Sequence, residues 1–291
     1  MSNTLVSICL PIYNGEKYLL EALESIGSQD YGHIEVIISD DKSSDASLEI
    51  IRDFFQGTTI DFKILNHEPA GIGSNWNNCI EHAKGDYIKF LFQDDVLEAH
   101  CVSNMVKILE FDKSIDICVS KRSFINERKP PYDTETQRFL TYCSDLQSGL
   151  NLPKDHLVVL DKKIFKNPAF YTSPKNKIGE PIATLFRKSL FDKIGLYRTD
   201  MKQILDYEIY YRALKHGKIA ILNEALVRFR IHEKQASQEN FGKALAEYKD
   251  MDHELYESYW PLLSWKKKLD LWLKFHPVAV KVEQLFYRLR N

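Results

Sequence analysis

Polar and acidic side chains follow each of four apolar segments in the first third of the chain. They come after residues 5–12, 34–38, 62–65 and 87–92, as Pro11-Ile12-Tyr13-Asn14-Gly15, Ser39-Asp40-Asp41, Asn66-His67-Glu68 and Gln93-Asp94-Asp95. If these segments are parallel strands, their carboxyl ends share one edge of a sheet, where open α/β sheets bind ligands. Any single loop could instead be polar because helix N-termini favour Asp and Ser. Four such loops in register predict one ligand site.

The adjacent carboxylates of Asp94 and Asp95 could bind a divalent cation. Mg²⁺ and Mn²⁺ favour oxygen ligands, and one or two carboxylates often hold them while substrate phosphates fill other positions. The sequence lacks the phosphate-loop pattern GxxxxGK[ST] and has no GxGxxG after the first apolar segment. The patterns HExxH and GxSxG are also absent. The alternative for this pair is an N-cap of the helix expected over residues 98–111.

Strand and helix patterns alternate regularly over the first 120 residues. Apolar residues recur at helical spacing over residues 17–26, 46–55, 75–83 and 98–111, between the expected strands. This alternation predicts βαβ units and a mainly parallel sheet. Residues 121–181 hold six of the ten prolines and are expected to be irregular. Later strands are expected at 182–186 and 220–231, and helices at 188–194, at 203–215 and from 241 onward, broken at Pro261 and Pro277.

Composition bounds the class of protein. The chain has 291 residues, a net charge of −2 and 44% hydrophobic residues, which is globular composition. The near-neutral charge argues against nucleic acid as a partner. The five cysteines are widely spaced without a CxxC pair, so neither a disulfide framework nor a zinc site is indicated. No signal peptide or apolar run of 18 residues is found, and we expect a cytoplasmic protein.

Three segments together resemble the family 2 glycosyltransferases of the GT-A fold: LVSICLPIYNGEKYLLEALESI, IEVIISDDKSSD and AKGDYIKFLFQDD. The resemblance covers roughly residues 4–235. It implies an α/β fold with a Rossmann-like, mainly parallel sheet flanked by helices and a helical C-terminal extension. Residues 1–120 would bind the nucleotide-sugar, 121–235 the acceptor and the catalytic base, and 236–291 would form the extension. The implied reaction moves a sugar from a nucleoside-diphosphate donor to an acceptor hydroxyl, with inversion, aided by Mn²⁺ or Mg²⁺.

For the donor site, the resemblance implies contacts from the first half of the chain. They are Pro11, Tyr13 and Glu16 beside the nucleotide, Asp40 at the base, Asn75 in the segment after the third strand, and Asp94 at the ribose. Asp95 corresponds to the metal ligand. The chain departs from the family pattern in three places: Gln93 stands where Asp is frequent, Trp76 and Cys79 stand where Arg and Gly are common, and Leu205 stands where Glu usually precedes the base.

For catalysis, the resemblance implies Asp206 as the general base, at the start of a helix. Asp206 could instead pair with Arg212, but six residues do not stack on one helical face. Glu208 is better spaced for Arg212, so Asp206 should face the cleft, with Glu208 as the second candidate for the base. The segment Arg230-Ile231-His232, with Ser237 after it, resembles a late motif that approaches the metal and the diphosphate. His232 is thereby implied as a metal ligand, the alternative being an ordinary hydrogen-bonded histidine.

The C-terminal segment is basic and rich in tryptophan. Residues 265–291 contain seven Lys or Arg and two acidic residues, and Trp260, Trp265 and Trp272 lie in or near this segment. This pattern suits a helix at an anionic membrane surface. Equally, the helix could pack on the catalytic domain or on a second subunit. The expected location is thus cytoplasmic, with peripheral contact at the inner face of the membrane and oligomerisation left open.

Three functions remain after the sequence is considered. The first is an inverting glycosyltransferase acting on a saccharide or lipid-linked acceptor, which the resemblance sets in surface polysaccharide or glycoconjugate synthesis. The second is a sugar-nucleotide nucleotidyltransferase, which would usually carry a glycine-rich, basic loop where this chain has Pro11-Ile12-Tyr13-Asn14-Gly15-Glu16. The third is a non-catalytic nucleotide-sugar-binding module. Acceptor choice is expected to lie in residues 121–181.

Overall fold

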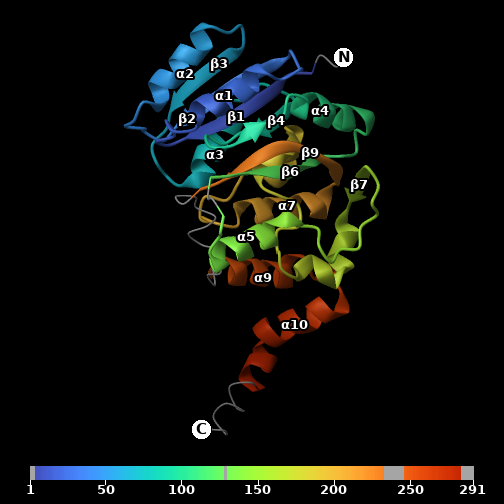
Figure 1. The fold of residues 1–291 in the computed structure, drawn as a ribbon. Helices are drawn as coiled ribbons and strands as arrows, with labels where there is room; N and C mark the ends of the chain where they lie inside the picture. Colours follow the sequence, from blue (N-terminus) through green and yellow to red (C-terminus); the bar gives the residue numbers. More distant parts are fainter. Residues whose placement is uncertain (1–3, 128–129, 233–245, 283–291) are drawn as a thin grey trace.

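This computed structural model describes residues 4–127, 130–232 and 246–282. Nine strands in these ranges form one mixed sheet (Figure 1). The strand order is β3-β2-β1-β4-β8-β6-β9-β5, and β7 pairs with β9. The strands are β1 (Val6–Ile12), β2 (Ile34–Asp40), β3 (Asp61–Asn66), β4 (Tyr87–Phe90), β5 (Val96–Leu97), β6 (Ile117–Asn126), β7 (Leu157–Leu160), β8 (Thr184–Arg187) and β9 (Ile219–Ile231).

The first four strands of the chain, β1 to β4, form the parallel part of the sheet. β1 pairs in parallel with both β2 and β4, and β2 pairs in parallel with β3. The crossovers contain α1 (Leu19–Gly27), α2 (Ser47–Gln56) and α3 (Ile72–His82). All seven residues of β1 are buried, as expected for a central parallel strand covered on both faces. The carboxyl ends of β1, β2 and β4 therefore lie together.

The second half of the sheet is mixed. β8 runs antiparallel to β4 and to β6, while β6 and β9 are parallel. β5 pairs antiparallel with β9, with Val96 opposite Arg228. Because β5 follows Asp94 and Asp95 directly, this pairing brings the end of β9 to the acidic pair.

The remaining helices cover the sheet and extend beyond it. They are α4 (Cys101–Phe111), α5 (Thr134–Ser144), α6 (Ser189–Ile194), α7 (Leu205–His216), α9 (Ala246–Ser258) and α10 (Trp265–Phe275), with 3₁₀ turns η1 (Lys162–Lys166), η2 (Pro168–Tyr171), η3 (Pro181–Ala183) and η4 (Trp260–Leu262). In Figure 1, α10 lies beyond α9, at the end of the molecule away from β3. No helix in the described ranges is long and apolar enough to cross a membrane.

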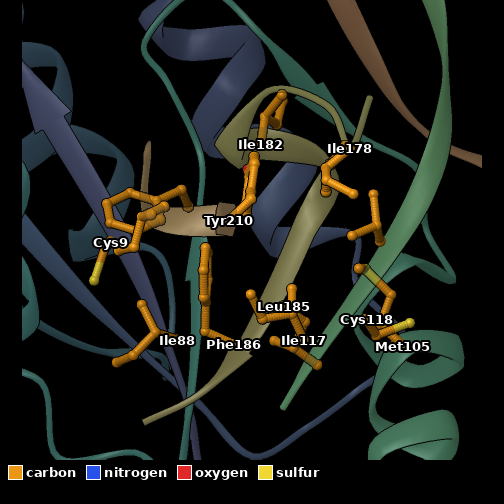
Figure 2. Packing of buried hydrophobic residues seen from close by; sticks show 14 of the residues in the cluster. Cys9, Ile88, Met105, Ile117, Cys118, Ile178, Ile182, Leu185, Phe186 and Tyr210 are labelled. Carbon is orange, nitrogen blue, oxygen red and sulfur yellow. The ribbon is translucent and has the colours of Figure 1, made fainter. Parts of the chain in front are cut away.

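The core joins the two halves of the sheet to α7. Figure 2 shows buried side chains from β1, β4, β6 and β8 and Tyr210 of α7 as members of one cluster. The rings of Tyr210 and Phe186 stack with centroids 6.3 Å apart. Both residues are buried, and this packing fixes α7 against the sheet. The N-terminus of α7, with Asp206, is thereby held at a set position relative to β4.

The fold class expected from the sequence is confirmed: the sheet is flanked by helices, its N-terminal part is parallel, and the C-terminal segment is helical. The expectation for residues 121–181 was incomplete. β6 continues to Asn126, and α5 and β7 lie within this range. In β6, Lys121, Arg122 and Ser123 interrupt the apolar run, so pairing with β9 and β8 defines the strand. The division at residues 120 and 235 stays a prediction; the first lies inside β6 and the second outside the described residues.

Candidate functional site

One cleft of about 1890 Å³ lies along the edge where the parallel strands end. Its walls come from the loop after β1, the end of β2, the start of α3, the loop after β4, η3, the start of α7 and the end of β9. Eight of the nine residues expected at the site line it: Pro11, Tyr13, Glu16, Asn75, Asp94, Asp95, Asp206 and His232. The ninth, Asp40, is not among the residues that line the cleft.

The loop after β1 is pinned to the loop after β4 by Gln93. The amide oxygen of Gln93 accepts from the backbone N–H of Tyr13 at 2.8 Å, and its nitrogen donates to the Tyr13 carbonyl at 3.1 Å. A carboxylate at this position could only accept. A Cβ on Gly15 would lie 2.7 Å from the same amide oxygen, so glycine is required there. Gln93 therefore holds the two loops together, and Tyr13 remains exposed in the cleft.

Glu16 links the first loop to the second. Its carboxylate accepts from the backbone N–H of Ala46 at 3.0 Å, and its own N–H donates to Asp45 at 3.0 Å. Glu16 thus lines the cleft and also fixes the start of α2 beside it.

The two aspartates at the end of β2 have different positions. Asp40 is buried, and its carboxylate accepts from the backbone N–H of Ser43 at 3.1 Å. Asp41 lines the cleft, and its carboxylate lies 2.5 Å from Nδ1 of His67. The other nitrogen of His67 lies 3.2 Å from the Ser74 hydroxyl in α3. Sequence analysis named Asp40, but the structure places Asp41 where a ligand can reach it.

The end of β9 holds the acidic pair. The backbone N–H of Arg230 donates to Asp95 at 2.8 Å, and Nε2 of His232 lies 3.0 Å from Asp94. Asp95 is only 2% exposed. Its burial, and next the negative charge of Asp94, hold the pKa of the Asp95 carboxyl well above its usual range. A bound cation would relieve this repulsion.

The Arg230 side chain braces the loop after β4. Its guanidinium donates to the backbone oxygen of Asp94 at 2.7 Å, to Glu21, and to Glu127 at 3.4 Å. It also lies 4.6 Å from the ring centroid of Tyr18. Of the late segment Arg230-Ile231-His232, His232 lines the cleft, whereas Arg230 is not among the lining residues. Ser237 lies outside the described residues.

The protein groups do not form a complete metal site by themselves. Among the described residues, no group of three or more His, Cys, Asp and Glu side chains is arranged to hold a metal ion. The acidic pair, in which the pKa of Asp95 is raised, fits a different arrangement, in which carboxylates supply one or two ligands and phosphates and water supply the rest. Asp94, Asp95 and His232 are the groups here that could take part.

Asp206 stands at the first turn of α7 and faces the cleft. One carboxylate oxygen accepts from the backbone N–H of Tyr207 at 2.7 Å, and the other accepts from the Asn176 amide at 2.7 Å. Burial raises the pKa of Asp206 to about 7, and the negative charge of Glu180 acts in the same direction. A carboxylate that titrates near neutral pH is suited to proton transfer.

Glu208 occupies the position expected for a structural ion pair. Its carboxylate lies 2.5 Å from Nε of Arg212, and its side chain is buried. Arg212 also donates to the backbone oxygen of Leu196 at 2.8 Å. Glu208 does not line the cleft, which leaves Asp206 as the carboxylate of α7 that a ligand can reach.

An aromatic surface lies between the two ends of the cleft. Trp76 and Phe92 both line it, with ring centroids 5.2 Å apart, and Trp76 packs edge-on against Tyr197 at 5.0 Å.

Glu180, which was not named from the sequence, lines the cleft beside Pro181. It lies in the segment expected to be irregular, where no periodic pattern or motif could mark it.

The cleft is acidic. Nine Asp or Glu residues line it, against two lysines, Lys17 and Lys202. Lys17 is itself paired with Glu127 at 3.0 Å. An anionic ligand would therefore be repelled unless a cation accompanied it.

The fold is that of the GT-A glycosyltransferases. Residues 7–195 match the sequence model of glycosyl transferase family 2, and the chain belongs to that family. It is 34% identical over 228 residues to the glycosyltransferase GlyG of Streptococcus pneumoniae, covering 78% of this chain and 70% of that protein.

Two solved structures share the fold at low sequence identity. One is TarS 1–349 of S. aureus in complex with UDP-GlcNAc, with a TM-score of 0.62 and 18% identity over 93% of this chain and 73% of that one. The other is the mannosyltransferase PcManGT of Pyrobaculum calidifontis in complex with GDP-Man and Mn²⁺. Its TM-score is 0.58, with 16% identity over 99% of this chain and 81% of that one.

The bridge made by Gln93 gives a first prediction. Gln93→Glu removes the donor to the Tyr13 carbonyl and sets a negative charge against that oxygen. We expect a loss of about 1 kcal/mol in the free energy of unfolding, measured by urea denaturation. Gln137→Glu is the matched control, because Gln137 is exposed on α5 and the change adds the same charge. Equal stability of the two variants would contradict a structural role for the bridge.

Proposed function

We propose that this protein is an inverting glycosyltransferase that moves a sugar from a nucleoside-diphosphate sugar to an acceptor hydroxyl. The observation that carries the proposal is that one cleft contains both an acidic pair suited to a cation and Asp206, a carboxylate that titrates near pH 7. The fold relatives solved with UDP-GlcNAc and with GDP-Man and Mn²⁺ support a nucleotide-sugar donor and a divalent cation.

The donor would lie against the ends of β1, β2 and β4. Asp94 would contact the ribose, and Pro11, Tyr13, Glu16 and Asn75 would contact the nucleotide. These residues come from three loops that the hydrogen bonds of Gln93 and Glu16 hold in fixed relation.

The base of the nucleotide would be read by Asp41. This carboxylate, held by His67, replaces Asp40 in that role because it lines the cleft. Asp40 would instead shape the turn through its bond to Ser43.

Asp95, the last residue of the segment Gln93-Asp94-Asp95, would hold Mn²⁺ or Mg²⁺ together with His232. When bound, the cation would stabilise the charge that develops on the leaving diphosphate. Asp94 keeps His232 oriented through their 3.0 Å contact, and the backbone of Arg230 keeps Asp95 in place.

Asp206 would act as the general base. Its carboxylate would take the proton of the acceptor hydroxyl while that oxygen forms a bond to the anomeric carbon. The bond from that carbon to the diphosphate breaks on the opposite side, so the configuration inverts. Asp206 comes from α7 and not from the loops of the donor half, which suits a base on the far side of the sugar.

The acceptor would be a saccharide or a lipid-linked saccharide, in surface polysaccharide or glycoconjugate synthesis. Tyr132, Lys202 and Gln203 line the cleft from the segments that precede α5 and α7. Tyr132 and Gln203 offer hydrogen-bonding groups suited to sugar hydroxyls. Membership in glycosyl transferase family 2 favours this function over a sugar-nucleotide nucleotidyltransferase. Asp206, a carboxylate in the cleft whose pKa is about 7, favours an enzyme over a non-catalytic binding module.

The tail helix α10 has two different faces. Its inner face packs on α9: Leu271 is buried, and Lys267 and Lys274 lie 2.8 Å and 3.0 Å from the Asp252 carboxylate. Its outer face carries Trp265, Leu269 and Leu273, which are 70%, 49% and 52% exposed. These three residues repeat every fourth position and so form one stripe.

We propose that this stripe binds an anionic membrane surface at the inner face of a cytoplasmic membrane. Positions 262–291 contain seven Lys or Arg and two acidic residues; Lys267 and Lys274 pair with Asp252 on the inner face, whereas Lys266 is exposed next to Trp265. The basic surplus beside exposed apolar residues matches acidic headgroups above an acyl layer. Such a contact would bring the cleft to a lipid-linked acceptor.

Metal dependence gives the second prediction. UDP should bind at least about tenfold more tightly with Mn²⁺ than with chelator, since the acidic cleft repels a bare diphosphate, as measured by calorimetry. Asp95→Asn keeps an acceptor for Arg230 but should abolish the metal effect, while Asp53→Asn on the surface of α2 should not. Equal affinity with and without metal would refute the proposed site.

The same site predicts that His232→Ala should lower turnover. Unchanged turnover would leave His232 only the role of orienting Asp94.

Asp206 gives the third prediction. Asp206→Asn should lower turnover by about 10²–10⁴-fold, the usual contribution of a general base, with donor affinity nearly unchanged. In the wild type, kcat/KM should rise with pH through about 7, because the base acts only when deprotonated. Asp250→Asn, on the exposed side of α9, is the control. Wild-type turnover in Asp206→Asn would exclude Asp206 as the base.

The stripe on α10 gives the fourth prediction. Replacing Trp265, Leu269 and Leu273 together by Ala should weaken sedimentation with anionic vesicles at least about tenfold, because burying one leucine contributes about 1.5–3 kcal/mol. Phe111→Ala is the control, since Phe111 is an exposed apolar residue on α4. Salt should weaken the binding. Failure of the wild type to bind such vesicles at low salt would overturn the membrane proposal, and a dimer lost in the triple variant would identify a subunit contact instead.

A further inference from the structure

Asn176 uses every hydrogen-bonding group of its side chain. Its amide nitrogen donates to Asp206 at 2.7 Å and to the Gly179 carbonyl at 2.9 Å. Its amide oxygen accepts from the backbone N–H groups of Ile178 and Gly179 at 2.9 Å and 3.0 Å. Three of these bonds close the turn from 176 to 179, and the fourth ties the turn to the Asp206 carboxylate. The amide is therefore fixed in orientation, with a donor aimed at Asp206.

The same turn leads directly to Glu180 at the cleft. Glu180 lies 2.9 Å from the guanidinium of Arg122 in β6, whose side chain is buried. After it, η3 is tied to β4 by Lys89, whose ammonium donates to the carbonyl oxygens of Ile182 and Thr184. The segment 176–184 is thus anchored to α7, to β6 and to β4, so Glu180 has a defined place between the base and the acidic motif.

Several groups act on the charge of Asp206. Glu180 approaches from the segment before η3. Tyr197, before α7, and Tyr210, in α7, interact with the same carboxylate: burial and then the negative charges near them, including that of Asp206, raise the pKa of both hydroxyls. Lys202 lines the same cleft. Of these, Glu180 is the carboxylate whose charge favours the protonated form of Asp206, whereas the Asn176 hydrogen bond favours the ionised form. The two neighbours therefore oppose each other.

We propose that residues 176–180 are the positioning element of the general base, in which Asn176 orients the Asp206 carboxylate and Glu180 places a second negative charge beside it. This inference rests on the proposed role of Asp206. With both oxygens of Asp206 engaged by Tyr207 and Asn176, the carboxylate cannot rotate freely. Its remaining lone pairs can face an acceptor hydroxyl. The negative charge of Glu180 raises the pKa of Asp206, so Asp206 can hold the proton that it takes from the acceptor near neutral pH.

The test uses two variants with opposite expected shifts. In Glu180→Gln the midpoint of the acid limb of kcat/KM against pH should move to lower pH. In Asn176→Ala it should move to higher pH, and Asn176→Gln should restore part of the change because it keeps an amide. Asn223→Ala removes a comparable amide bond to the Asp155 carbonyl and should shift nothing. A purely structural role would lower stability and rate but would not move the midpoints in opposite directions.

A second readout separates this inference from the proposed reaction. The titration of Asp206 can be followed by carbon NMR of the carboxyl group in the full chain with Mg²⁺, without any turnover. Opposite shifts of this titration in Glu180→Gln and Asn176→Ala support the positioning element, even if Asp206→Asn retains turnover and the assigned reaction fails. Unshifted titrations, or shifts in the same direction, overturn the positioning element even if Asp206→Asn is inactive. Should Asn176→Ala fail to fold, Asn176→Ser and the isosteric Glu180→Gln carry the same comparison.

Discussion

The pairing of the end of β9 with the loop after β4 is the constraint on which the cleft depends. Asp94 and Asp95 sit at the end of a buried strand, where neighbouring carboxylates repel each other. β9 supplies what keeps them there: a backbone N–H for Asp95, an imidazole for Asp94 and a buried guanidinium under the loop. The packing of α7 on the same sheet then sets Asp206 across from them. The acidic pair and Asp206 are therefore both held in position by the same sheet, Asp206 through the packing of α7 on it.

The burial that raises the pKa of the cleft carboxylates also lowers the stability of the folded protein. Burial raises the pKa of Asp206 from 3.8 to about 7. Between these values the folded protein holds a proton that the unfolded chain has released, so stability declines as pH rises through this range. Asp95 contributes in the same sense. The aromatic core beneath α7 offsets this cost, and a cation at the acidic pair would offset more of it. A ligand bound in the cleft would therefore add stability at the site where these two carboxylates lower it.

Much of the N-terminal half could be predicted from sequence because its signals are local. Apolar strands with helices between them predicted β1 to β4, and polar residues that follow β1, β2 and β4 do line one cleft, whereas Asn66, His67 and Glu68 after β3 are not among its lining residues. The structure differs from the sequence-based expectation where long-range packing decides. Asp40 and Asp41 are adjacent, and only the turn after β2 determines which one faces the ligand. Arg230 looks like a ligand contact by motif, yet its acidic partners lie far away in sequence. Asn176 and Glu180 belong to no periodic pattern at all.

The distances along the chain between contacting residues have a consequence for biosynthesis. The Arg230 side chain meets Glu21, which precedes it by 209 residues, and its backbone meets Asp95, which precedes it by 135. Contacts between such remote residues form late, because the loop-closure entropy must be overcome first. On the ribosome, β1 to β4 emerge well before β9 and can assemble early. The acidic pair remains without its brace until residue 232 has left the ribosome, so an incomplete chain holds no finished cleft.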